Sequence, residues 1–322
     1  MSELTTAEGP KLALTPETRE PRALLAFLAF LQKHLPRGRG AIPRMIGAKL
    51  AEGLSHHLTT RHGAKLCLSS SSYDVYATMA QTGNAWDYED FRICLDSISE
   101  TGVFFEIGAN VGYFAVEAAN LRRNARVYAF EPQSDLAGAI ERSARLNNFG
   151  NLTVIDALVG DSEGDRILYL AAATIHASAV EDSGRKPLSS VPKVMITIDG
   201  MVTRGDLPAP TFVKMDVEGS EALVFRGAAQ AFRKHCPNIF LEYLPEFDVD
   251  NRIRGEVMAL VSDVPDYKLY GIPSMNKRAS HPKLLIPIDE IGWADVHGLY
   301  ILNQSMSLPN PDLLDRRATL RP

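Results

Sequence analysis

The chain has 322 residues, of which 45% are hydrophobic and 23% are charged, and its net charge is −5. A chain of this length and composition can bury a core without disulfides or structural metals. The acidic balance disfavours a surface that binds nucleic acid. The three cysteines, Cys67, Cys94 and Cys236, are isolated and odd in number, which argues against a disulfide framework and favours a reducing, cytoplasmic setting.

The N-terminal third of the chain carries no recognisable chemistry. Residues 1–20 are polar and lack apolar periodicity, which predicts a mobile segment. Residues 21–98 predict a helical N-terminal extension, interrupted by the Pro36–Pro43 segment. The longest apolar run there, Ala23–Leu31, has nine residues, whereas a membrane-spanning helix needs about 20. We therefore expect a packed or interface helix and no transmembrane segment.

Short apolar runs alternate with helical patterns from about residue 99 onward. The predicted strands are 102–107, 126–130, 152–155, 212–215 and 239–241, and the predicted helices are 113–121, 134–147 and 221–232. This alternation predicts βαβ units with helices on both faces of a parallel sheet. We expect a doubly wound, mostly parallel α/β domain over residues 99–305, followed by a C-terminal tail, 306–322.

Three features depart from this alternation. Asp161–Asp165 predicts a tight turn between strands. Residues 172–192 are rich in Ser, Pro and Gly and predict a long surface loop, of the kind that often borders a ligand site. Tyr267–Gly271 and Gly298–Leu302 predict an antiparallel pair of strands at the edge of the sheet.

A glycine-rich turn follows the first predicted strand, in the sequence EIGANVG of residues 106–112. Glycine lets the backbone turn sharply and lets a ligand approach closely, and the amides at the start of the next helix favour anionic or polar groups. A dinucleotide fingerprint that begins at Gly108 would need glycine at positions 110 and 113, where this chain has Asn110 and Tyr113. The turn is therefore nucleotide-like, and an NAD(P)-dependent oxidoreductase is the less favoured alternative.

Acidic residues follow the next two predicted strands. Glu131 ends the second strand, 25 residues after Glu106, where an acid typically accepts hydrogen bonds from ribose hydroxyls. Asp156 and Ala157 follow the third strand, beside the same crevice, and Asp156 could accept from an adenine amino group. A solvated acid at a strand end, or an aspartate that only forms a turn, is the structural alternative.

A lysine and three acids cluster where the fourth predicted strand meets a helix, in the sequence KMDVEGSE of residues 214–221. Acids in a first helical turn are stabilised by the helix dipole, so a capping role is one interpretation. However, Lys214 and Asp216 lie within or directly after an apolar strand, and partly buried charges must pair or meet a polar ligand. This favours a site role for Asp216 and Glu218.

Taken together, these segments resemble the FkbM family of methyltransferases, within the larger class I, Rossmann-like group. The resemblance rests on EIGANVG (106–112), VYAFEP (127–132), LNN (146–148), ITID (196–199), FVKMDVEGSEALVFRGA (212–228) and IFLEYLP (239–245). It covers residues 100 to 245 and extends more weakly to 303, and Glu106 stands where the family more often has Asp. It implies a seven-stranded sheet and S-adenosylmethionine as cofactor. The implied cofactor-binding residues are Glu106, Gly108, Ala109, Asn110 and Gly112 around the methionine part, Glu131 and Pro132 by the ribose, Asp156 and Ala157 by the adenine, and Asp216.

The resemblance also implies O-methylation of a hydroxyl on a sugar or secondary metabolite, hence a small-molecule or carbohydrate acceptor. A base near the acceptor would speed the reaction by about 10²–10⁴-fold. Asp216 and Glu218 are the candidate catalytic residues, and the candidate substrate residues are Lys214, Glu242 and His176. His176 and His297 are rival bases. A cation held by Asp216, Glu218 and Glu242 is conceivable, but we predict no metal, and a non-catalytic scaffold on a nucleotide fold is a further alternative.

Overall fold

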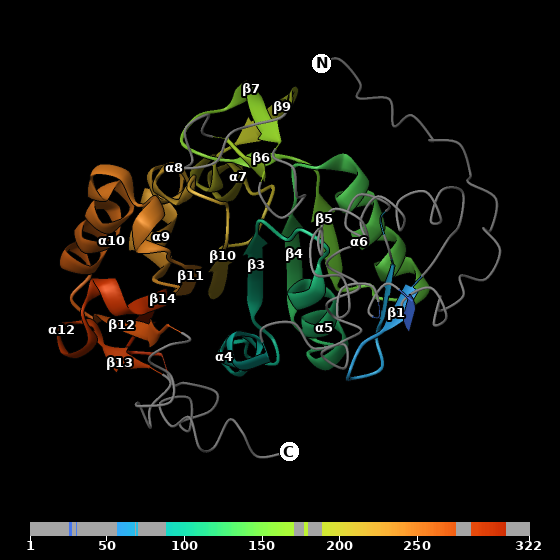
Figure 1. Ribbon diagram of the computed structural model, residues 1–322, viewed down its shortest axis with the longest axis horizontal. Coiled ribbons are helices and arrows are strands. Elements are labelled where there is room, and N and C mark those ends of the chain that lie inside the picture. Colours follow the sequence, from blue (N-terminus) through green and yellow to red (C-terminus); the bar gives the residue numbers. More distant parts are fainter. Residues whose placement is uncertain are drawn as a thin grey trace.

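The computed structural model describes residues 57–67, 69, 88–170, 177–179, 189–274 and 285–306, together with 26, 27 and 30 (Figure 1). An eight-stranded sheet forms its centre, in the order β13-β12-β14-β11-β10-β3-β4-β5. Its strands are β3 (Val103–Ile107), β4 (Arg126–Phe130), β5 (Leu152–Ile155), β10 (Phe212–Met215), β11 (Asn238–Glu242), β12 (Tyr267–Pro273), β13 (Ile286–Pro287) and β14 (Val296–Asn303). The strands from β5 to β11 are parallel, and the other three are antiparallel.

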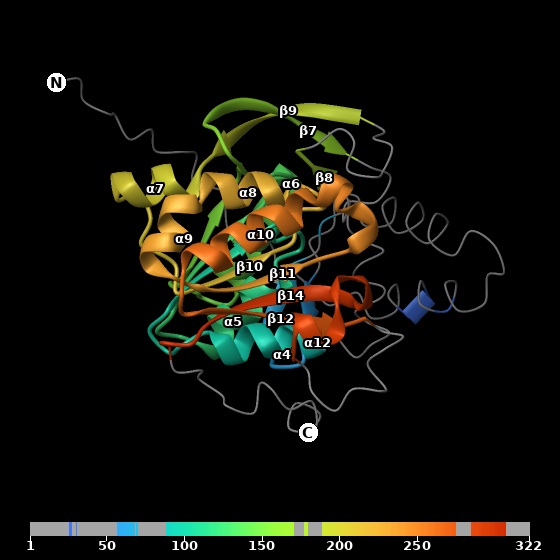
Figure 2. The same ribbon diagram turned by 90° about the vertical axis from the view of Figure 1, so that its left-hand side faces the viewer.

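Helices cover both faces of this sheet (Figures 1 and 2). One face carries α4 (Tyr88–Ser97), α5 (Tyr113–Leu121) and α6 (Ser134–Leu146), and the other carries α7 (Ile198–Arg204), α8 (Glu221–Gly227), α9 (Ala229–His235) and α10 (Arg252–Asp263). Shorter elements are α12 (Ile288–Ile291), η3 (Pro245–Phe247), η4 (Val249–Asn251) and η5 (Trp293–Asp295). Successive strand residues point to opposite faces, so Phe104 packs in the first core and Phe105 in the second. The predicted doubly wound, mostly parallel sheet is confirmed.

The count and the edge of the sheet differ from the prediction. The two-residue β13 adds an eighth strand to the seven expected, because it pairs with β12 at Tyr270 and Gly271. The antiparallel pairing of β12 with β14 is as predicted. However, β14 lies inside the sheet, between β11 and β12, and is not an edge strand. Its fully buried residues, including Tyr300, reflect that position.

The strand order reverses between β3 and β10. The chain leads from β3 to β4 and β5 on one side, and from β10 to β11 on the other. The helix that follows β3 covers one face, whereas the helix that follows β10 covers the opposite face. The two loops therefore separate at the carboxyl ends of these strands and leave a crevice, which is where ligands bind in open α/β sheets.

A second sheet, β6-β9-β7-β8, lies at one end of the large sheet, at the top of Figure 1. It consists of β6 (Leu158–Val159), β7 (Gly164–Leu170), β8 (Ala177–Ser178) and β9 (Ser189–Ile196). The turn predicted over 161–165 does separate two of its strands. The loop prediction for 172–192 is wrong in two places, because residues 177–178 form β8 and residues 189–192 belong to β9, and both pair with β7. Residues 172–176 and 180–188 of that prediction lie outside the described residues. Leu158, Leu168 and Met195 of this sheet are buried, whereas Ile167, Val191 and Val194 are exposed.

The helical prediction for residues 21–98 is only partly correct. The helix α4 is present, but β1 (His57–Thr59) and β2 (Lys65–Cys67) form an antiparallel hairpin. Leu58 and Leu66 of this hairpin are buried in the same core as Phe91 and Phe104, so the packing is continuous across the boundary that we expected at residue 99. The hairpin supplies too few alternating positions for a strand signal. Residues 1–20 and 307–322 lie outside the described residues.

Two general expectations can be compared with the structure. In the described part of the chain, no helix is both long and apolar enough to cross a membrane. The three cysteines are free; Cys67 and Cys94 are buried, and Cys236 is half-buried.

Candidate active site

A cavity of about 560 Å³ opens at the carboxyl ends of the central strands, at the point where the strand order reverses. Its lining residues are Ile107, Gly108, Asn110, Phe130, Glu131, Pro132, Gln133, Ala157, Leu158, Val159, Ala179, Asp216, Val217, Glu218 and Ser220. One cavity is therefore lined by residues at the ends of β3, β4, β5 and β10 and by residues of the second sheet.

The glycine turn after β3 is tied to the neighbouring strand. The amides of Gly108 and Ala109 both donate to the carbonyl oxygen of Phe130, each at 3.0 Å. Gly108 has φ +80°, and a Cβ there would overlap the backbone oxygen of Asp216. Gly108 is therefore the point where the turn after β3 touches the turn after β10. Only glycine fits, because it tolerates both the left-handed backbone and the close contact.

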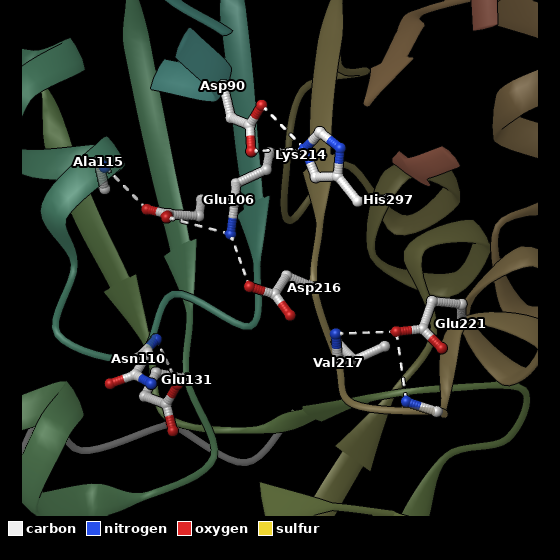
Figure 3. Close-up of polar contacts among 11 residues, drawn as sticks. Asp90, Glu106, Asn110, Ala115, Glu131, Lys214, Asp216, Val217, Glu221 and His297 are labelled. Carbon is white, nitrogen blue, oxygen red and sulfur yellow. Dashed lines mark hydrogen bonds and ion pairs between the residues drawn. The ribbon is translucent and has the colours of Figure 1, made fainter. Parts of the chain in front are cut away.

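Glu131 holds the same turn from the end of β4 (Figure 3). Its Oε2 accepts from the amide of Asn110 at 2.7 Å, and its Oε1 accepts from the amide of Gln133 at 2.9 Å. The residue is 3% exposed, and this burial raises the pKa of its carboxyl to about 8. Each oxygen retains a second lone pair, so Glu131 can still accept from a ligand hydroxyl.

Asn110 occupies the position where a dinucleotide fingerprint would have glycine. Its φ is +52°, in the left-handed region that asparagine tolerates better than most residues. Its buried Oδ1 has no hydrogen-bond partner within the described residues. It lines the cavity, so the turn presents an unused acceptor there.

Glu106, which was predicted to contact the cofactor, is buried and is not among the residues that line the cavity. Its side chain is on the same face of β3 as that of Phe104, the face that α5 covers. There its Oε2 accepts a hydrogen bond from the amide of Ala115 at 2.7 Å. Its Oε1 is 3.8 Å from Lys214 Nζ. Burial raises the pKa of Glu106 to about 7, against the opposing effect of Lys214. Glu106 thus caps α5 and pairs with the buried lysine.

Lys214 is the charged centre beneath the cavity (Figure 3). It is 5% exposed, and its Nζ lies 3.3 Å from Asp216 Oδ2 and 4.8 Å from the centre of the Phe114 ring. Burial alone would lower the pKa of Lys214, but Asp216 and Glu106 outweigh it and raise that pKa. The expected pairing of a buried lysine with an acid is present, although Lys214 itself does not line the cavity.

Three carboxylates gather beside Lys214, at the edge of the cavity. Asp216, Glu218 and Glu242 each place an oxygen within 4.8 Å of the others. The charge of Asp216 is the main cause that raises the pKa of Glu242 to about 10. Glu242 therefore keeps its proton near neutral pH and donates a hydrogen bond to Asp216. Such a cluster could hold a hard divalent cation, but the proton on Glu242 and the charge of Lys214 already offset its repulsion.

The turn after β10 is held by Glu221, the one acid of the KMDVEGSE cluster to which the sequence analysis assigned no site role. Glu218 and Gly219 are both left-handed, with φ +53° and +92°. Glu221 Oε1 accepts from the amides of Val217 at 3.2 Å and Gly219 at 3.3 Å. Burial raises the pKa of Glu221 to about 7. An acid at the start of a helix resembles an ordinary dipole partner, so only the adjoining Glu-Gly pair could have signalled this role.

Three of the remaining predicted cofactor residues, Ala109, Gly112 and Asp156, lie outside the lining. Ala109 is buried in the turn, and Gly112, with φ +75°, packs against Ile140 of α6. Asp156 forms an ion pair with Lys193 of β9, so its carboxylate is directed to the second sheet. Its neighbour Ala157 does line the cavity.

The structure describes one of the two histidines proposed as rival bases, His297. His176 lies outside the described residues. His297 is held at both ring nitrogens, because Nδ1 is 3.0 Å from the carbonyl oxygen of Pro273 and Nε2 is 3.1 Å from Asp90 Oδ2. Both ring nitrogens therefore face oxygen atoms of the protein, and His297 does not line the cavity. This geometry argues against His297 as the base.

The residues of the cavity fit a nucleoside. Phe130, Leu158 and Val159 supply apolar surface for a flat ring, and Glu131 supplies carboxylate oxygens for hydroxyls. The sharp turn at Gly108 leaves room for close approach of a ligand. The adenosine part of S-adenosylmethionine combines these same features.

Comparisons with known proteins point the same way. Residues 106–263 match the methyltransferase FkbM domain. The chain is 28% identical over 170 residues to the hexuronic acid methyltransferase AglP of Haloferax volcanii. The aligned part covers 51% of this chain and 68% of that relative.

Two solved methyltransferase structures are also similar. One is an FkbM methyltransferase from Methylobacillus flagellatus, with 19% identity and a TM-score of 0.42, covering 82% of this chain and 60% of that one. The other is an O-methyltransferase from Bacillus cereus, with 12% identity and a TM-score of 0.38, covering 80% of this chain and 96% of that one. The match of residues 106–263 to the methyltransferase FkbM domain, together with the similarity to a named methyltransferase, identifies the protein as an S-adenosylmethionine-dependent methyltransferase.

Proposed function

We propose that the protein methylates a hydroxyl group of a sugar or a sugar-containing metabolite. The observation that carries this proposal is the position of Asp216 and Glu218, which line the cofactor cavity and also belong to the acidic cluster at its edge. The name of the relative that acts on hexuronic acid supports a sugar acceptor. A small acceptor also suits a site edged by carboxylates, because these would repel the phosphates of a nucleic acid.

We assign the cofactor to the cavity between the two turns. Glu131 accepts hydrogen bonds from the ribose hydroxyls, beside Pro132. Ala157 contacts the adenine ring, and Gly108 and Asn110 border the methionine part. When bound, the cofactor supplies an electrophilic methyl group, so the protein has to position the acceptor and remove its proton.

Asp216 and Glu218 perform the acid–base part of this work. A sugar hydroxyl is a weak nucleophile near neutral pH, so a carboxylate that accepts its proton accelerates transfer by about 10²–10⁴-fold. Lys214 orients Asp216 through their contact. Glu242 keeps its proton, so it donates a hydrogen bond and does not act as the base.

The substitutions Asp216→Asn and Glu218→Gln test this assignment. With an acceptor found by a screen that uses labelled S-adenosylmethionine, at least one of them lowers turnover by about 10²-fold or more. Cofactor affinity, measured by calorimetry, changes far less for Glu218→Gln. Glu290→Gln removes an exposed acid and serves as the control. Full turnover by both variants would contradict the assignment.

The chemical nature of the product tests the acceptor group. Methylation of a hydroxyl gives an ether that survives alkali, whereas methylation of a carboxylate gives an ester that alkali hydrolyses. We expect an alkali-stable product. Loss of the label on treatment with alkali would show that the acceptor atom belongs to a carboxylate.

A further inference from the structure

The turn after β10 adopts a backbone conformation that its own sequence does not favour. Glu218 is left-handed although it is not glycine, and Gly219 after it is left-handed as well. Residues with a Cβ rarely adopt this conformation without outside support. The turn nevertheless supplies Asp216, Val217, Glu218 and Ser220 to the cavity wall.

The support comes from one carboxylate oxygen. Glu221 Oε1 accepts from the amides of Val217 and Gly219, the two residues that flank Glu218 (Figure 3). Glu221 is 4% exposed, and its Oε2 is buried with no hydrogen-bond partner among the described residues. The backbone amide of Glu221 itself is a further hydrogen-bond partner of this carboxylate.

This arrangement differs from ordinary helix capping. Glu221 is the first residue of α8, and a capping side chain would accept from an amide within the first turn of its own helix. Glu221 does bind its own amide, at the start of the helix, but the other two amides that it binds belong to residues 217 and 219, which precede the helix. Its bonds therefore fix the shape of the turn.

We infer that Glu221 is a positioning residue for the methyl-transfer site: it holds the turn that places Asp216 and Glu218 at the cofactor cavity. This inference rests on the proposed function, because it takes the cavity as the cofactor site. Glu221 does not line the cavity and acts only through the turn.

The test compares the affinity of S-adenosylmethionine with thermal stability in the full chain. Glu221→Ala removes the acceptor, so we expect its Kd for S-adenosylmethionine to rise about 10- to 100-fold. Glu221→Gln keeps a carbonyl oxygen for both amides and places its NH₂ group at the unpartnered side, so its Kd stays within about 3-fold of wild type.

Asp199→Ala is the matched control. Asp199, in α7, also accepts from two backbone amides, those of Gln230 and Ala231 at the start of α9, and it does not line the cavity. We expect this variant to lower the Tm without changing the Kd. If Glu221→Ala does not fold, hydrogen exchange of wild type and Glu221→Gln decides: the amides of the 216–220 turn remain protected in both if the inference is correct.

Several outcomes would overturn the inference. One is an unchanged Kd in Glu221→Ala. Another is a Kd in Glu221→Gln as weak as in Glu221→Ala, because the charge and not the acceptor oxygen would then matter. Rapid exchange of the turn amides in the wild-type chain would also do so. Failure of the wild-type chain to bind S-adenosylmethionine would instead refute the proposed function.

Discussion

Two turns border the cavity, one after β3 and one after β10, and a buried glutamate holds each of them. Glu131 accepts from Asn110 and Gln133 with separate oxygens, whereas Glu221 accepts from two amides with one oxygen. Both turns contain a non-glycine residue with positive φ. The first glutamate also lines the cavity, and the second does not.

This difference teaches how the two glutamates can be recognised. Glu131 both shapes a turn and faces the ligand, so it follows a strand in a position that fold rules associate with ribose binding. Glu221 only shapes its turn, so its sequence position resembles that of any acid at a helix start. A site can therefore depend on two similar side chains of which sequence reasoning identifies one.

The largest expected effect is at Gly108, where the two turns touch. Gly108→Ala adds a Cβ that overlaps the backbone oxygen of Asp216, and it forces alanine into a left-handed backbone. We expect the free energy of unfolding to fall by about 2–5 kcal/mol. Gly205→Ala is the control, because Gly205 has φ +78° with open space around it, and it should cost about 1–2 kcal/mol. Equal losses of unfolding free energy in the two variants, measured by urea denaturation, would show that the contact between the turns does not contribute to stability.

One pair of glutamine substitutions tests whether Glu131 and Glu221 bond to their turns in different ways. Glu131→Gln must place its NH₂ group against the amide N–H of Asn110 or of Gln133. Two buried hydrogen-bond donors then face each other without an acceptor. We expect a loss of about 1–3 kcal/mol in stability and about a 10²-fold weaker Kd for S-adenosylmethionine. Glu221→Gln meets no such conflict. Calorimetry and denaturation of both variants check this, and equal behaviour of the two would contradict the assigned bonding.

The pH dependence of stability sharpens the same comparison. Burial raises the pKa of Glu131 to about 8 and that of Glu221 to about 7, from 4.5. Between pH 4.5 and these values the folded state binds more protons than the unfolded state, so stability falls as the pH rises. We expect Glu131→Gln to remove on the order of 1 kcal/mol of that fall between pH 5 and 8. Parallel denaturation curves for wild type and variant across this range would count against it.

The smallest effect is expected at the ion pair between Asp156 and Lys193. The side chain of Asp156 is 42% exposed, so solvent screens the pair and it contributes less than about 1 kcal/mol. Because the carboxylate is directed to β9, we expect Asp156→Asn to change the Kd for S-adenosylmethionine by less than about 3-fold. A much larger loss, with Lys193→Met showing none, would restore Asp156 as an adenine ligand.

The sequence predicted the doubly wound sheet because strand runs that alternate with helices leave few topologies. It predicted Glu131 and Asp216 for the same reason, since both follow central strands. It did not place Glu106, whose direction depends on which face of β3 it occupies. It also missed the β1–β2 hairpin, because its three-residue strands are too short to show a period.

Hydrogen exchange of the full chain, with and without S-adenosylmethionine, tests whether the two glutamate-held turns form one cofactor site. The cofactor should slow exchange in both residues 108–113 and residues 216–221, and NADH at the same concentration should slow neither. Protection of only one turn, protection elsewhere in the chain, or a response to NADH in place of S-adenosylmethionine would contradict a site built from both turns.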